Sequence, residues 1–219
     1  MTTAIVGDVH GNVVRLRAAL SHLVNRVDEL VFVGDYVDRG PASREVLDIL
    51  VELKASRLSQ VTLLRGNHDN ALLEFIQSGN RDLFIAHGGL TTVRSYMTDI
   101  PANEPLNIFR STFPPYHAEL LEGTSLYLER DDLLVSHCGY NPAFPQSRSL
   151  ENMVTGRFPD LFQTAANAPR SLVVFGHYVQ DSGAPYVAPG LVCLDTGCGT
   201  LPDGPLSVLM LPDHNILQF

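Results

Sequence analysis

Residues 3–11, TAIVGDVHG, set the pattern that decides the fold. The apolar run at 3–6 is followed at once by a glycine and then by Asp8 and His10, residue types that bind metal ions. The same arrangement follows the apolar runs at 30–33, 61–64, 133–135 and 172–175. Short apolar runs without alternation are typical of strands buried on both faces. The sequence therefore predicts polar side chains gathered at the ends of several buried strands.

Amphipathic segments separate the first three runs. Residues 13–27 and 43–55 carry apolar side chains at helical spacing, with Ser43 as a predicted N-cap. The alternation of strand and helix predicts βαβ units, in which ligand residues lie beyond the carboxyl ends of parallel strands. Later strands are predicted at 126–129, 132–136, 172–176, 186–194 and 206–211, with excursions from the sheets at 99–118 and 139–170.

Composition narrows the classes of function. The 219 residues carry 15 basic and 24 acidic side chains, a net charge of −9, which makes nucleic acid a poor partner. No apolar run reaches the ~20 residues that span a bilayer, so no membrane partner is expected. The N-terminus lacks the pattern of a signal peptide, and the 3 cysteines are too few for a disulfide framework. We expect a soluble, cytoplasmic protein with reduced, buried cysteines; the role of Cys138, beside His137, is left open.

Six strand-end residues form a candidate metal centre. One cation could take Asp8, His10 and Asp35, and a second could take Asp35, Asn67, His137 and His177. Asp35 would then bridge two ions about 3.5–4 Å apart, the spacing of two-metal hydrolytic sites. Carboxylate and imidazole ligands without thiolate favour Mn, Fe or Zn over Ca, Mg or Cu(I). Any one of these residues alone is more often a turn former, but their recurrence at successive strand ends favours one shared site.

Two other polar residues are candidates for a place near this metal centre. Asp195 is predicted to be a structural, hydrogen-bonding carboxylate. His87, before Gly88-Gly89, is a further histidine that could line the pocket.

Three motifs carry a family resemblance. Gly7-Asp8-x-His10-Gly11, Gly34-Asp35-x-Val37-Asp38-Arg39-Gly40 and Gly66-Asn67-His68-Asp69 resemble the signature motifs of metallophosphoesterases. The similarity is to the phosphoprotein phosphatase branch, which includes bacterial and phage serine/threonine phosphatases and symmetrical diadenosine tetraphosphatases. The resemblance implies a calcineurin-like α/β fold of four layers, in which two packed β-sheets are flanked by helices. Residues 1–219 would be one domain, with a small cap or rim around 80–130.

The resemblance also implies roles for residues outside the ligand set. His68 would donate a proton to the leaving alkoxide, Asp38 would orient His68, and Arg39 would clamp the phosphate. A histidine paired with a carboxylate has a raised pKa, which suits a general acid near neutral pH. A second phosphate-binding arginine is expected, and Arg157 fits better than Arg148.

The predicted function is the hydrolysis of phosphomonoesters by a dimetal enzyme. A metal-bridging hydroxide would attack the phosphorus atom in line. The expected ions are two Mn²⁺, with Fe or Zn as alternatives. The expected substrate is a protein or peptide phosphorylated on serine or threonine. One alternative substrate is a dinucleoside polyphosphate such as diadenosine tetraphosphate. Asp69 favours it, because many protein phosphatases of this branch have Glu there, and Phe109, Phe113 and Tyr116 could stack on bases. Tyr178, where the family usually has Thr, also leaves the substrate class open.

An alternative of another class is a binding scaffold that has lost catalysis. The intact ligand set and the intact pair of His68 and Asp38 argue against it.

Overall fold

The first β-sheet is built around the motif-bearing strands. The computed structural model describes residues 1–219 except 57–58, 98, 100–102, 131 and 168–171. Three parallel strands lie side by side, and two strands from the C-terminal end of the chain complete the sheet in antiparallel pairing, in the order β10-β9-β1-β2-β3. The strands are β1 (Thr3–Val6), β2 (Glu29–Phe32), β3 (Gln60–Leu63), β9 (Ser207–Leu211) and β10 (Asn215–Gln218).

The second β-sheet has parallel strands at its centre and antiparallel strands at both edges. Its order is β4-β5-β6-β8-β7, with β5, β6 and β8 parallel. The strands are β4 (Tyr127–Arg130), β5 (Leu133–Ser136), β6 (Leu172–Phe175), β7 (Tyr186–Ala188) and β8 (Leu191–Cys193). Parallel strands in both sheets end near one another, which brings the polar strand ends of the sequence into one region.

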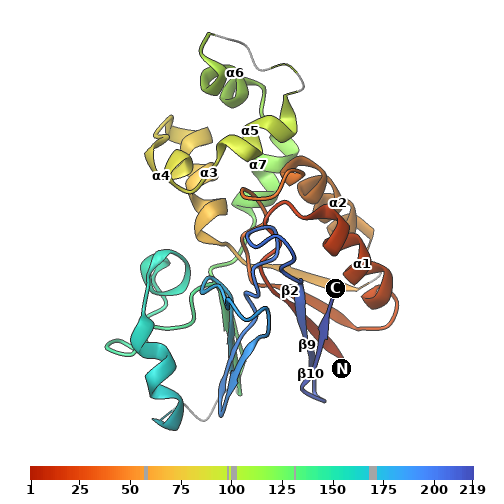
Figure 1. Ribbon diagram of the computed structural model, residues 1–219, viewed down its shortest axis with the longest axis vertical. Coiled ribbons are helices and arrows are strands. Elements are labelled where there is room, and N and C mark those ends of the chain that lie inside the picture. Colours follow the sequence, from red (N-terminus) through yellow and green to blue (C-terminus); the bar gives the residue numbers. More distant parts are fainter. Residues whose placement is uncertain (57–58, 98, 100–102, 131, 168–171) are drawn as a thin grey trace.

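The two sheets pack face to face through alternating β-branched residues. Val31 from the first sheet lies in one buried cluster with Val135 and Val174 from the second. The opposite face of the first sheet packs on α1 (Val13–Leu23) and α2 (Ser43–Ser56), and that of the second packs on η1 (Glu151–Thr155) and η2 (Pro159–Asn167) (Figure 1). The predicted α/β fold, with two packed sheets flanked by helices, is confirmed.

The region around 80–130 is helical. It contains α4 (Asp82–Ala86), α5 (Leu90–Tyr96), α6 (Pro105–Thr112) and α7 (Pro115–Glu122), which lie beside α2 and α3 (Asn67–Ser78). Phe84 and Phe109 stack with Phe75 of α3 at centroid distances of 5.1 Å and 6.4 Å from it, so aromatic packing anchors this region. Tyr116, named above as a residue that could stack on bases, is 45 % exposed. A cap within a single domain stays a prediction.

Local boundaries differ from the sequence prediction in three places. The strand predicted at 186–194 is two antiparallel strands, β7 and β8, because the chain reverses at Gly190, whose φ is 75°. The C-terminal strand β10 was not predicted. Helix α1 ends at Leu23, short of residue 27, and the chain turns at Asn25, which has a φ of 66°. In the part of the chain that the structure describes, no helix is both long and apolar enough to cross a membrane.

Candidate metal centre and active site

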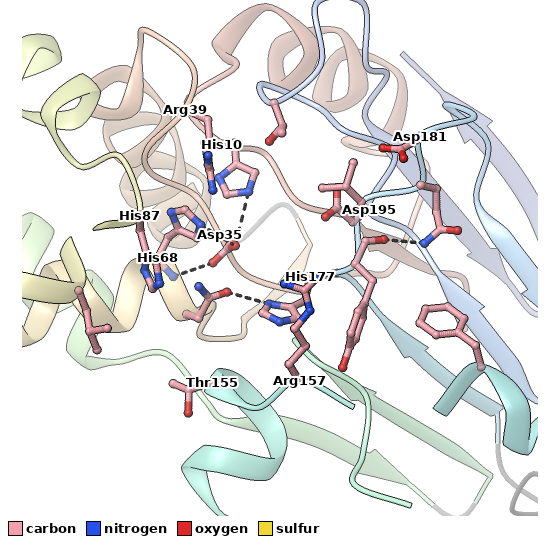
Figure 2. Close-up of a pocket in the computed structure, with 17 residues that line it drawn as sticks. His10, Asp35, Arg39, His68, His87, Thr155, Arg157, His177, Asp181 and Asp195 are labelled. Carbon is pink, nitrogen blue, oxygen red and sulfur yellow. Dashed lines mark hydrogen bonds and ion pairs between the residues drawn. The ribbon is translucent and has the colours of Figure 1, made fainter. Parts of the chain in front are cut away.

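A pocket of about 780 Å³ opens where the parallel strands of both sheets end (Figure 2). Most of the predicted site residues line it, and the others lie buried beneath its floor. The lining residues are His10, Asp35, Arg39, Asn67, His68, Arg157 and His177, and the buried ones are Asp8, Asp38 and His137. The structure therefore brings the predicted constellation together from five strand ends.

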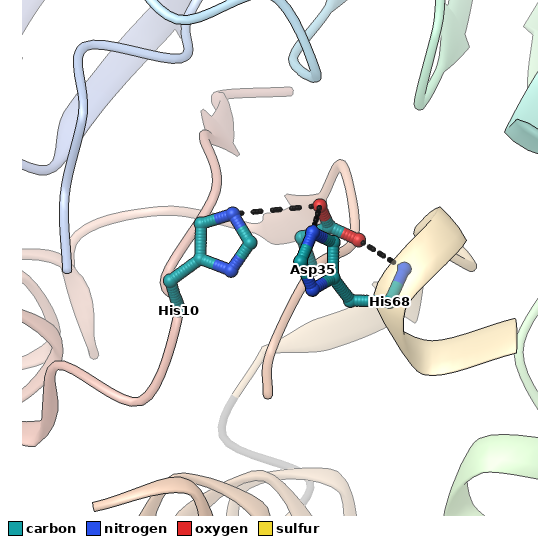
Figure 3. A group of neighbouring side chains, drawn as sticks. All are labelled: His10, Asp35 and His68. Carbon is teal, nitrogen blue, oxygen red and sulfur yellow. Dashed lines mark hydrogen bonds and ion pairs between the residues drawn. The ribbon is translucent and has the colours of Figure 1, made fainter. Parts of the chain in front are cut away.

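Asp35 lies at the centre of the constellation. One of its carboxylate oxygens, Oδ2, is 3.5 Å from His10 Nε2 (Figure 3). The same oxygen is 3.4 Å from His137 Nε2. The other, Oδ1, accepts a hydrogen bond from the backbone N–H of His68 at the start of α3. Asp35 belongs to both groups of mutually close ligand atoms, one with His10 and His68 and one with Asp8 and His137. This is the arrangement that a bridging carboxylate requires, although Asp8 groups with His137 rather than with His10.

The unpartnered atoms of the site fit metal ions. Asp8 Oδ1 is buried and has no hydrogen-bond partner in the described part of the chain. The Nδ1 atoms of His10 and His137 face the backbone carbonyls of Val37 and Val33, at 3.0 Å and 3.2 Å, so these nitrogens carry the protons. In the neutral rings each Nε2 then presents a lone pair to the centre of the site.

Two ring nitrogens face the amide oxygen of Asn67 where the second ion is predicted. His137 Nε2 lies 2.9 Å from Asn67 Oδ1, and His177 Nδ1 lies 2.8 Å from the same oxygen. A lone pair opposite an amide oxygen is repulsive unless a proton or a metal cation lies there. Burial would lower the pKa of His137, but the charge and hydrogen bond of Asp35, together with the charges of Asp8 and Asp69, outweigh it and raise that pKa to about 9. His137 must therefore give up its second proton before Nε2 can bind a cation. The site thus attracts positive charge strongly.

The pKa values of the other predicted ligands are shifted in different directions. Burial lowers the pKa of His10 to about 4 and that of His177 to about 3, the latter helped by the charge of His137. Both imidazoles are therefore neutral, the form that binds metal ions. Burial raises the pKa of Asp8, and nearby Asp195 raises it further. For Asp35 the neighbouring histidines, His137 first, outweigh burial and hold the pKa well below its usual value.

Several site residues adopt left-handed backbone conformations, which non-glycine residues rarely do. Among the described residues, those with positive φ include His10 (43°), Asp35 (55°), Asp38 (67°), Arg39 (65°) and His177 (66°). Neighbouring glycines permit the close approach of the carboxylates: a Cβ at Gly66 would collide with Asp35, and one at Gly176 would collide with Asp8. The strand ends are thus shaped to turn their ligands inward.

Asp69 holds the loop that carries Asp35. Its carboxylate accepts hydrogen bonds from the backbone N–H groups of Asp35 (2.7 Å), Tyr36 (2.9 Å) and Gly66 (2.9 Å). Sequence reasoning took Asp69 as a marker of substrate class and missed this structural role. The signal was available, because an acidic residue at the third position of a helix commonly accepts from the preceding turn.

His68 and Asp38 form the predicted pair. His68 Nδ1 lies 2.8 Å from Asp38 Oδ2, and both side chains are buried. Burial would lower the pKa of His68, but the charge of Asp35 and the hydrogen bond to Asp38 outweigh it and raise that pKa above its usual value. Thr92 of α5 donates its hydroxyl hydrogen to Asp38 Oδ1 at 2.6 Å. Nothing in the sequence pattern pointed to Thr92, which lies 54 residues away.

The two candidate arginines differ in position. Arg157 is exposed and lines the pocket. Arg148 instead makes two hydrogen bonds to the Glu129 carboxylate, at 2.6 Å and 2.9 Å, and is absent from the pocket lining. Tyr178, which stands where the family usually has Thr, accepts a hydrogen bond from the backbone N–H of Phe158 at 2.6 Å. Tyr178 therefore holds the segment that presents Arg157.

The remaining candidates are also placed by the structure. Asp195 is buried and lines the pocket, and its Oδ1 accepts from the backbone N–H of Gly197, the local bond expected of a structural carboxylate. All three cysteines are buried and free. Burial raises the pKa of Cys138 to about 12, which leaves its thiol unreactive. His87 lines the pocket beside His68.

Comparisons with known proteins agree with this geometry. A family model described as calcineurin-like phosphoesterase matches residues 1–189. An asymmetrical bis(5'-nucleosyl)-tetraphosphatase PrpE from Oceanobacillus iheyensis is 29 % identical, covering 90 % of this chain and 84 % of that protein. Serine/threonine-protein phosphatase 2 of Escherichia coli is 36 % identical over 39 % of this chain and 37 % of its own length. A solved structure described as a candidate diadenosine tetraphosphatase has a TM-score of 0.69 at 22 % identity, covering 100 % of this chain and 92 % of that one, which shows a shared fold.

Proposed function

The chain belongs to the calcineurin-like phosphoesterase family, and from this premise we propose that it hydrolyses phosphoserine and phosphothreonine esters in proteins. The observation that carries the proposal is the buried contact of 2.8 Å between His68 Nδ1 and Asp38. An alkoxide is a poor leaving group and needs a proton as it departs, which a histidine with a raised pKa supplies. When a dinucleoside polyphosphate is hydrolysed, the leaving group is the phosphate oxygen of a nucleotide, which needs protonation less than an alkoxide does.

The protein's own residues bind and orient the substrate. The six strand-end ligands would hold two divalent ions, and we propose Mn²⁺, with Fe or Zn as alternatives, from the mixture of carboxylate, amide and imidazole donors. When bound, such ions activate water and neutralise charge on a phosphoryl group. Arg39 and Arg157 line the pocket and would hold the phosphoryl oxygens by charge-assisted hydrogen bonds. His68 would protonate the departing oxygen. The free cysteines are consistent with a cytoplasmic location.

A dinucleoside polyphosphate is the second candidate substrate. The similarity to the Oceanobacillus tetraphosphatase favours it, because that similarity covers 90 % of this chain. Phe109 and Phe113 are buried and do not line the pocket, so they are not available to stack on a base. Phe162 and Tyr178 do line the pocket and offer aromatic surface there.

A substrate panel on one preparation of defined metal content separates the two candidates. A phosphoserine or phosphothreonine peptide, p-nitrophenyl phosphate and diadenosine tetraphosphate would be compared by kcat/KM. We expect the phosphopeptide to exceed the dinucleotide. Dominant turnover of the dinucleotide would replace the proposed substrate by the second candidate, and no turnover of any of them would refute the assignment as a phosphoesterase active on these classes.

A further inference from the structure

His87 is a pocket residue that neither the motifs nor the ligand geometry assigns. It follows α4 directly, and its side chain is half-buried on the pocket wall next to His68 (Figure 2). The ring centroids of His87 and His68 are 4.7 Å apart, with an angle of 33° between the ring planes. His87 therefore covers one side of the ring that we propose as the proton donor.

The other contacts of His68 leave that side to His87. Asp38 holds Nδ1 of His68 at 2.8 Å, and His10 approaches the ring edge to face, with centroids 4.7 Å apart and an interplanar angle of 76°. A single hydrogen bond fixes one atom of an imidazole but still allows the ring to pivot about that atom. Packing from His87 limits that pivot, which sets where the Nε2 proton of His68 points.

His87 itself is held by packing and by its backbone. Its Nδ1 is buried with no hydrogen-bond partner in the described part of the chain, and no hydrogen bond of its side chain is seen there. Its backbone N–H donates to Leu83 O at 2.9 Å. The ring of Phe84, on the same helix, stacks on Phe75 of α3 with centroids 5.1 Å apart. Since α3 begins at Asn67, the helix that carries His68 and the helix that precedes His87 are joined by this stack.

The charges of the two rings suit this contact. Burial lowers the pKa of His87, and the neighbouring charge of His68 lowers it further. A neutral aromatic ring beside a protonated imidazole is attractive.

We propose that His87 is a positioning residue, whose tilted ring packs against His68 and fixes the direction in which His68 delivers its proton to the leaving group. The proposal rests on the proposed role of His68 in phosphomonoester hydrolysis. It makes α4, outside the three motifs, a part of the active site.

The test compares two substitutions that separate packing from polarity. His87→Asn keeps a polar side chain but removes the stacked ring, whereas His87→Phe keeps an aromatic ring and removes both nitrogens. We expect His87→Asn to lower kcat on an alkyl phosphate by about 10-fold, a part of the ~10²–10⁴-fold that acid catalysis supplies. His87→Phe should restore most of that loss. KM and metal content should change little in either variant.

The leaving group provides the second readout. Neither variant should lower kcat on p-nitrophenyl phosphate by more than about 2-fold, because that phenolate departs with little protonation. Leu83→Ala is the matched control, since Leu83 lies on α4, lines the same pocket and is 51 % exposed. It should leave the ratio of the two activities unchanged.

Three outcomes would overturn the proposal. Equal losses on both substrates would indicate a structural role. Wild-type activity in His87→Asn, together with a raised KM in His87→Phe, would indicate a hydrogen bond from His87 to substrate. An unchanged kcat on both substrates in both variants would indicate no role. Each of these outcomes requires a wild-type enzyme that hydrolyses both phosphates. Failure of the proposed function would appear instead as an inactive wild-type enzyme on both substrates.

Discussion

The two sheets contribute to the pocket in different ways. The ends of β1, β2 and β3 carry loops in which carboxylates are tied to backbone N–H groups, as Asp69 is to three of them. The ends of β5 and β6 each supply a single imidazole, His137 or His177, and the nearby Arg157 depends on one hydrogen bond from Phe158 to Tyr178. The part of the pocket built by the loops after β1, β2 and β3, which we call the frame, consists of contiguous motifs held by these hydrogen bonds. The part built after β5 and β6, which we call the second half, consists of separate residues and should tolerate substitution better.

The largest effect should come from Asp35→Asn, in the frame. Asp35 lies in both groups of ligand atoms, so its loss disturbs both predicted ions. Activity should fall by more than the ~10²–10⁴-fold that acid catalysis contributes, and both ions should be lost. His177→Asn, in the other half, should lose one ion at most. Metal analysis of the purified variants, together with kcat, checks the comparison, and two ions retained by Asp35→Asn would refute the bridging role.

The next effect concerns the proton donor of the frame. His68→Asn should keep both ions and lower kcat by about 10²–10⁴-fold on an alkyl phosphate, with a smaller loss on p-nitrophenyl phosphate. Asp38→Asn should give a milder form of the same pattern. Loss of a metal ion from His68→Asn would show that this residue is a ligand, an outcome that its position near Asp35 makes worth measuring.

The pH dependence of that step follows from the raised pKa of His68. The acid works in its protonated form, so kcat on an alkyl phosphate should fall as pH rises through the pKa, which lies above the usual 6.5. Removing the Asp38 carboxylate should lower this pKa and move the falling limb to lower pH. A pH profile of kcat for the wild type and Asp38→Asn measures the shift. If the falling limb of the pH profile stays in place in Asp38→Asn, Asp38 does not raise the pKa of His68.

Arginine substitutions probe the second half. Arg157→Ala should raise KM by about 10–100-fold, the cost of a lost hydrogen bond to a charged group. Arg148→Ala is the control, because Arg148 is paired with Glu129 and should leave KM unchanged. The measurement is KM for p-nitrophenyl phosphate with both variants fully loaded with metal. A raised KM in Arg148→Ala alone would exchange the two assignments.

The same contrast explains what the sequence could predict. Parallel strands followed by Gly-Asp or Gly-Asn motifs place their ligands within a few residues, so the predicted metal ligands followed from local pattern. The pair of His68 and Asp38 was implied by the family resemblance. Thr92 was not predicted, and His87 was named only as a residue that could line the pocket. Their contacts with Asp38 and His68 depend on tertiary packing, of α5 on α2 and of α4 on α3. Of the backbone partners of Asp69, only Gly66 is local and could have been expected from the helix start, whereas Tyr36 and Asp35 are 33 and 34 residues away in the chain. Local pattern predicts ligands, and tertiary packing supplies their supports.

The smallest expected effect tests how separate residues cooperate in the second half. Tyr178→Phe removes the oxygen that accepts from Phe158 N–H, a hydrogen bond worth about 1 kcal/mol, and frees the segment that presents Arg157. KM should rise a few-fold, less than in Arg157→Ala, with metal content unchanged. Tyr186→Phe is the control, because its hydroxyl donates to Phe162 O and does not touch that segment. If Tyr178 acts through Arg157, the double variant should be no worse than Arg157→Ala alone, because residues in one network are not additive. Additive increases in KM would instead mean that Tyr178 contacts the substrate itself, and the two halves of the pocket would then be more alike than the structure indicates.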